Sequence, residues 1–167
     1  MLVLRASKTM AVAVIALLVS LVAFGNLTDY DTNFAFVQHV LLMDTILPSS
    51  TIRYRAITNP VLHHAAYALI IAAEVLTAAL CWMGALQLLR HIGDTGQGFN
   101  RAKRTAIAGL TVGFLLWKVG FIALGGEWFG MWMSQQWNGI PSAFRYLVMT
   151  LGVMIFLSLP DQDTSEP

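Results

Sequence analysis

Charged residues are scarce in this chain of 167 residues: they make up 11%, whereas 57% of the residues are hydrophobic. Soluble domains carry about 25% charged and about 45–50% apolar residues. A soluble core of this size cannot hide so much apolar surface, so the composition excludes an ordinary soluble globular protein. The net charge of +1 argues against nucleic acid or another polyanion as partner.

Cysteine occurs once, at Cys81, so no disulfide can form within the chain. Cys81 lies inside an apolar run, where we expect it to act as a small buried hydrophobic side chain. Common catalytic signatures are absent too: there is no P-loop, Rossmann glycine pattern, HExxH, GxSxG or CxxC. We therefore expect a protein that is not an enzyme, with no catalytic residue, bound metal or cofactor.

The apolar residues collect in four runs, at about 9–25, 61–89, 105–126 and 142–159. Each is near the length of about 20 residues that crosses about 30 Å of hydrocarbon. The pattern predicts an all-α fold, a polytopic membrane protein with a four-helix transmembrane bundle in the lipid bilayer. We place this single domain at 1–160 and expect residues 161–167 to form a disordered cytoplasmic tail.

The first run, which follows Arg5 and Lys8, also fits a cleaved signal peptide. It is longer than the usual hydrophobic region of about 7–15 residues, so we favour a retained helix. In the long connection 26–60, apolar residues of the stretch NFAFVQHVLLMDTIL recur at near-helical spacing. This spacing predicts a short amphipathic helix in the first outer loop.

Lysine and arginine are distributed unevenly between the two sides of the predicted membrane. One side carries Arg5, Lys8, Arg90, Arg101, Lys103 and Arg104, and the other carries Arg53, Arg55 and Arg145. Because positive charge favours the cytoplasmic side, we expect both termini in the cytoplasm.

Two of the apolar runs each carry a charge near the middle, Glu74 in the second and Lys118 in the third. A charge at bilayer depth costs at least about 2.5–3.5 kcal/mol and is rarely left without a partner. At about 1.5 Å per residue, the two side chains sit at depths that differ by about 4 Å. We expect them to pair. The pair would be a structural clasp or a proton or ion site, unless one charge faces a partner protein or lipid headgroup.

Three glycines of the third run, Gly109, Gly113 and Gly120, share one helix face, roughly opposite Lys118. Small residues let another backbone approach closely. We expect Lys118 to face the second run, and the glycine face to receive the first or fourth helix or another subunit.

Histidines and an acid on the predicted outer side form a weaker candidate, an outer polar or metal cluster of His39, His63, His64 and Glu127. Such side chains ligate metals. Adjacent residues such as His63 and His64 point about 100° apart on a helix, however, so hydrogen-bonded interfacial histidines are the alternative.

Four segments resemble a known family: TDYDTNFAFVQHVLLMDT, RAITNPVLHHAAYALIIAAE, FNRAK and GGEWFGMWMSQQWNG. The chain resembles the bacterial predicted small integral membrane proteins grouped as domain of unknown function 2165. The resemblance implies a bacterial inner-membrane protein of four helices. It carries over no activity, cofactor or functional residue.

Three functions fit these patterns. The first is a non-enzymatic accessory or assembly component of a membrane complex, with a membrane-protein partner or a second copy of the chain. The alternative is a small proton- or ion-coupled transporter that uses Glu74 and Lys118. A third is an outer-facing enzyme or metal-binding protein.

Overall fold

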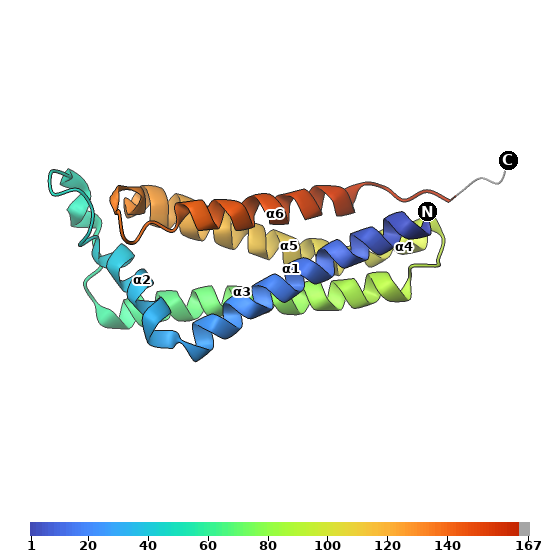
Figure 1. Cartoon of the computed structure of the whole chain (residues 1–167), viewed down its shortest axis with the longest axis horizontal. Helices are drawn as coiled ribbons and strands as arrows, with labels where there is room; N and C mark the ends of the chain where they lie inside the picture. The colour runs from blue at the N-terminus through green and yellow to red at the C-terminus, as the bar shows by residue number, and fades with distance from the viewer. Residues whose placement is uncertain (164–167) are drawn as a thin grey trace.

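The computed structural model describes residues 1–163, and within them all regular structure is helical. Long helical rods lie side by side, with Met1 and the end of the last helix at the same end of the bundle (Figure 1). We call this end the terminal end, and the opposite end, which carries α2, the cap end. The elements in chain order are α1 (Leu2–Thr28), α2 (Tyr30–Leu42), η1 (Thr51–Arg55), α3 (Pro60–Arg90), α4 (Gly96–Ala102), α5 (Arg104–Leu115), η2 (Leu116–Trp128), η3 (Met131–Met133) and α6 (Ile140–Ser158).

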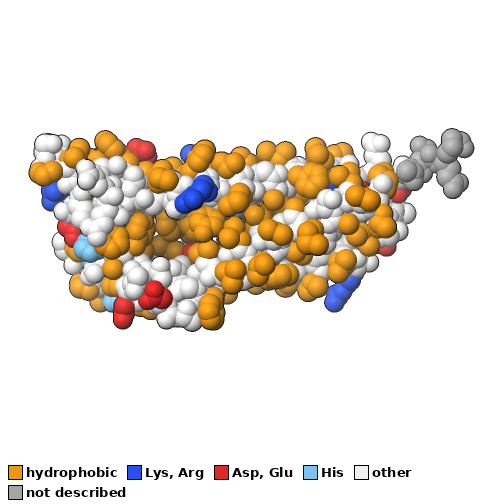
Figure 2. Space-filling model, in the orientation of Figure 1, with side chains coloured by type: hydrophobic (Ala, Val, Ile, Leu, Met, Phe, Trp, Pro, Cys, Tyr) orange, Lys and Arg blue, Asp and Glu red, His pale blue; other side chains and the backbone are white. Residues whose placement is uncertain are grey.

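The predicted fold class is confirmed. Four helical segments in the described part of the chain are long and apolar enough to cross a membrane: α1, α3, the stretch from α4 through η2, and α6. The amphipathic helix expected in the loop 26–60 is α2. Figure 2 shows hydrophobic side chains over the sides of the bundle, with most acidic and basic side chains toward its two ends.

The longest helix, α3, has a well-defined start. Asn59 caps it by accepting a hydrogen bond from the backbone nitrogen of Val61 at 2.9 Å, and Pro60 occupies the first turn. Its 31 residues span about 46 Å at about 1.5 Å per residue. This exceeds the hydrocarbon thickness of about 30 Å, so α3 tilts or extends beyond that layer.

The third membrane span changes its helix type partway. α5 continues without a break into η2, which is a π-helix. A π-helix closes hydrogen bonds from i to i+5, so its turns are wider than those of an α-helix. Residues after Leu116 therefore face directions that a continuous α-helix would not give them.

Small residues hold α3 and α5 close together. A Cβ built on Gly84 would lie 2.5 Å from the backbone nitrogen of Ala106, and one on Gly109 would lie 2.9 Å from that of Cys81. One on Gly113 would lie 3.0 Å from the methyl group of Thr77. The glycine face of the third span thus receives α3. This corrects the expectation that it receives the first or fourth helix or another subunit.

Apolar clusters join the remaining elements, and two of them position the polar groups described next. The larger cluster packs α1 against α3, α5 and α6, and its fully buried members include Val12, Ala16, Leu88, Leu110 and Leu157. At the cap end, Val37 and Leu41 of α2 pack on Tyr67 and Ile71 of α3. The second cluster fixes α2 over the ends of the spans and beside the polar groups described next.

Candidate functional site

A carboxyl group lies buried inside the bundle, on Glu74 in α3. The residue is 1% exposed. The side-chain nitrogen of Asn26, near the end of α1, donates to both carboxyl oxygens, at 3.0 Å to Oε1 and 2.8 Å to Oε2. Among residues 1–163, no lysine, arginine or histidine nitrogen lies within 4.0 Å of this carboxyl group. A buried carboxyl group without a counter-charge is costly, so it marks a candidate site.

Polar side chains extend from this carboxyl group toward the cap end. The Tyr67 hydroxyl donates to the backbone oxygen of Asn26 at 3.0 Å. The rings of Tyr67 and Tyr30 meet edge to face, with centroids 4.8 Å apart. The Tyr30 hydroxyl in turn lies 2.8 Å from Nδ1 of His64, which is exposed. We call these three side chains the polar column; their contacts run from the surface to Asn26, which holds the buried acid.

The expected pair of Glu74 and Lys118 is not formed. Glu74 faces Asn26, whereas Lys118 is exposed on η2. The cause is the orientation of the third span, whose glycines Gly109 and Gly113 face α3 and leave the opposite side pointing away from it. A lysine there can extend its flexible chain toward the membrane surface, so it has no need of an acidic partner.

The expected outer cluster is not assembled either. Nδ1 of His39 lies 2.7 Å from Oδ2 of Asp44, and Nε2 of His63 lies 2.7 Å from the backbone oxygen of Ile57. His64 contacts Tyr30, and Glu127 is exposed. Within residues 1–163 no three His, Cys, Asp or Glu side chains come together to hold a metal. Each histidine instead has its own hydrogen-bond partner.

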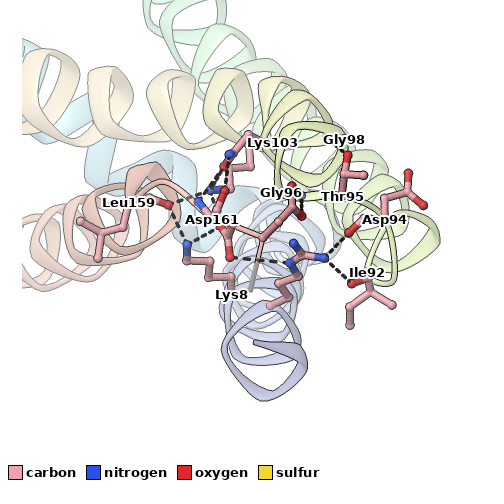
Figure 3. A network of polar contacts seen from close by, with 12 residues as sticks. Lys8, Ile92, Asp94, Thr95, Gly96, Gly98, Lys103, Leu159 and Asp161 are labelled. Carbon is pink, nitrogen blue, oxygen red and sulfur yellow. Dashed lines mark hydrogen bonds and ion pairs between the residues drawn. The ribbon is translucent and has the colours of Figure 1, made fainter. Parts of the chain in front are cut away.

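A second polar network closes the terminal end, around the carboxylate of Asp161 (Figure 3). Its Oδ2 lies 2.6 Å from Nζ of Lys8 in α1 and 2.6 Å from Nζ of Lys103, between α4 and α5. Both ammonium groups also donate to the backbone oxygen of Leu159, each at 2.7 Å. Asp161 is 5% exposed, and its ion pairs with the two lysines hold the segment after α6 against α1 and the α4–α5 junction.

Neighbouring groups complete this network. Asn100 donates to the backbone oxygen of Asp161 at 2.8 Å and accepts from its backbone nitrogen at 3.1 Å. Arg5 donates to the backbone oxygens of Ile92 and Asp94 in the turn after α3. Burial would raise the pKa of Asp161, but the hydrogen bonds and charges of Lys103 and Lys8 outweigh it and hold that pKa below its ordinary value.

The region 161–163 thus differs from the disordered tail that the sequence suggests. Sequence reasoning assigns Lys8 and Lys103 to membrane orientation and Asp161 to the tail, because polarity is the dominant local signal. An acid directly after Pro160, on the side with most of the cations, is a weak hint of pairing. Residues 164–167 lie outside the described part of the chain.

Asn26 is also missed by sequence reasoning. The first apolar run ends by composition at residue 25, where glycine is followed by asparagine, but α1 continues through both residues to Thr28. Asn26 therefore remains helical, and its side chain reaches α3. Only the packing angle of the two helices reveals this contact.

Four apolar rods, a buried carboxyl group and ion pairs at one end define a small integral membrane protein with several spans. The chain matches the family described as predicted small integral membrane protein (DUF2165) over residues 4–160, and it belongs to that family. No curated protein and no solved structure matches the chain.

Proposed function

We propose that this chain is a small proton-coupled membrane transporter in which Glu74 takes up and releases the proton. One observation carries the proposal: the Glu74 carboxyl group is buried in a membrane span with the neutral amide of Asn26 as its hydrogen-bond donor. A neutral acid avoids the cost of a buried carboxylate. Loss of the proton leaves a charged carboxylate that only water or a cation can stabilise well. Release of the proton therefore favours a different arrangement of the helices around Glu74.

The position of the amide links this proton to helix movement. Asn26 belongs to α1 and Glu74 to α3, so the hydrogen bonds between them cross a helix interface. The polar column of Tyr67, Tyr30 and His64 supplies the route toward the cap end. Because Glu74 is closed to solvent in the described conformation, exchange requires α1 and α3 to separate near Asn26.

Proton movement in proteoliposomes tests this function. With an imposed pH gradient we expect Glu74→Gln to abolish protein-dependent proton movement. The variant should keep the fold, because glutamine preserves the shape and its one side-chain oxygen still accepts a hydrogen bond from Asn26. Glu127→Gln is the matched control, since Glu127 is an exposed acid near the cap end. Proton movement that Glu74→Gln leaves unchanged would contradict the proposal.

A chemical probe gives an independent readout. A hydrophobic carbodiimide reacts with protonated carboxyl groups in apolar surroundings, so we expect it to modify Glu74 and to block proton movement. Mapping the modified peptide by mass spectrometry identifies the site. Absence of label on Glu74 at acidic and neutral pH would count against a proton-binding role.

A non-enzymatic accessory role in a larger complex is the second candidate. The observation favouring it is an open groove between α1 and α6, whose lining includes Ala6, Ala11 and Gly152. A Cβ built on Gly152 meets nothing within 4 Å, so this side of the bundle can admit another helix. Native mass spectrometry in mild detergent tests it: a strictly monomeric chain without a partner speaks against this role.

We further propose that the protein resides in a bacterial inner membrane with both termini in the cytoplasm and α1 retained. The excess of lysine and arginine at the terminal end supports this orientation. The contribution of α1 to the core, through Val12 and Ala16, supports its retention. Alkaline phosphatase fused after residue 167 should be inactive; an active fusion would reverse the orientation.

A further inference from the structure

A cavity of about 430 Å³ lies at the cap end between α2, α3 and η2. Its lining is almost wholly apolar, with Val40 and Leu41 from α2, Ile70 from α3, and Phe121 and Leu124 from η2. Its volume falls in the range of about 300–1,000 Å³ that small-molecule sites occupy. No polar solute would gain hydrogen bonds from these walls.

Small residues leave the cavity open. Ala66 and Ala73 line it on α3, and Gly120 lines it on η2. A Cβ built on Gly120 would meet only Cδ1 of Leu116, at 3.7 Å, so larger side chains fit there and would fill the space. α2 packs across the cap-end side of α3 through Val37 and Leu41 and bounds the cavity there, so the cavity is a half-open pocket rather than a bare helix face.

A cation lies beside the cap-end rim. Nη1 of Arg55 donates to the backbone oxygen of Trp128 at 3.2 Å, and its guanidinium carbon lies 4.7 Å from the centre of the Trp128 ring. Phe129, the next residue, and Ile57, two residues after Arg55, both line the cavity. Within residues 1–163 no carboxylate lies within 4.0 Å of Arg55.

We propose that this pocket holds one acyl chain of an anionic phospholipid whose phosphate binds Arg55. Two of its walls, α3 and η2, belong to membrane spans, so bilayer hydrocarbon is the solvent nearest to the pocket. An unneutralised arginine stacked on a tryptophan at the rim matches the level of lipid headgroups, and its guanidinium group suits phosphate. The pocket and Arg55 together recognise an amphipathic molecule with an anionic head. This site is independent of proton binding at Glu74.

Binding of defined lipids to the purified full chain tests the site. Delipidated protein in mild detergent is mixed with phosphatidylglycerol or phosphatidylcholine, and native mass spectrometry and thermal unfolding are measured. We expect one phosphatidylglycerol per chain and a raised unfolding temperature. Binding should be at least about tenfold weaker for phosphatidylcholine, because its choline cation cancels the net charge of the headgroup and repels the Arg55 guanidinium group. Equal binding of the two lipids, or no bound lipid, would overturn the proposal.

Variants separate the pocket from the headgroup contact. Gly120→Leu fills the cavity and should abolish binding, whereas Gly120→Ala leaves most of it open and should retain the lipid. Arg55→Gln should remove the preference for phosphatidylglycerol. Arg53→Gln is its control, because Arg53 donates to the backbone oxygen of Ile46 instead.

Two further results would overturn the site. One is lipid binding by folded Gly120→Leu that equals that of Gly120→Ala. The other is full thermal stabilisation by glycerol 3-phosphate alone, which would show a site for soluble phosphate rather than for lipid. Circular dichroism of each variant confirms folding.

Discussion

Oδ2 of Asp161 lies 2.6 Å from Nζ of Lys8, a contact that joins the segment after the last helix to the beginning of the first. Both side chains are fully buried, and Lys103 approaches the same oxygen. The carboxylate is thus the shared counter-charge of two lysines that would otherwise lie buried without one. It ties α1, the α4–α5 junction and the end of α6 together.

We predict that Asp161→Asn destabilises the protein by about 3–5 kcal/mol, because removal of one partner leaves buried cations uncompensated. Chemical or thermal unfolding in detergent measures the effect. Asp31→Asn, at an exposed position on α2, should change the stability little. Equal stability of the two variants would mean that the buried ion pairs do not hold the terminal end.

The same carboxylate predicts an acid limit to stability. The pKa of Asp161 is lowered in the folded protein, so its stabilisation is complete above the unfolded value of about 3.9. That stabilisation is lost as the pH falls through the lower, folded pKa. Unfolding temperatures between pH 6 and pH 2 should drop below about pH 4 in the wild type. Asp161→Asn should lack the part of this drop that comes from Asp161. If its unfolding temperature falls with pH in the same way as that of the wild type, Asp161 is not the group responsible.

The separation of Glu74 from Lys118 predicts independent charges. Lys118→Gln should change the free energy of unfolding by no more than about 0.5 kcal/mol, as at other exposed positions. Glu74→Lys should be strongly destabilising, and added Lys118→Glu should not rescue it. A double-mutant cycle measures the coupling, which we expect within about 0.5 kcal/mol of zero. Recovery in the exchanged pair would show that the two side chains meet.

The close approach of α3 and α5 predicts opposite effects for two glycine substitutions. Gly109→Ala should destabilise by about 1–3 kcal/mol, because its Cβ would press on the backbone of Cys81. Gly152→Ala, in α6 with open space around it, should stabilise by about 0.4–1 kcal/mol through lower unfolded-state entropy. Unfolding of both variants in one detergent provides the comparison, and a neutral Gly109→Ala would contradict the packing.

The spans were predictable because an apolar run long enough to cross a bilayer leaves few structural alternatives. In lipid, backbone hydrogen bonds must be satisfied within the segment, so each run becomes a helix. α2 was predictable for a related reason: its apolar residues recur at helical spacing, so they form one face that must pack against another apolar surface. The start of α3 is likewise local, since Asn59 caps the helix and Pro60 occupies its first turn. These features depend on neighbours along the chain.

The partners of the buried charges were decided by the tertiary structure alone. Sequence shows that Glu74 needs a partner, but the rotation of α5 and η2 about their axis determines whether Lys118 can supply it. That rotation follows from the fit of Gly84, Gly109 and Gly113 into the α3–α5 interface. Asn26, on α1, lies opposite Glu74 instead, and Asp161 lies between Lys8 and Lys103. Side-chain type and spacing determine what each helix requires, whereas only packing of distant segments determines which groups satisfy it.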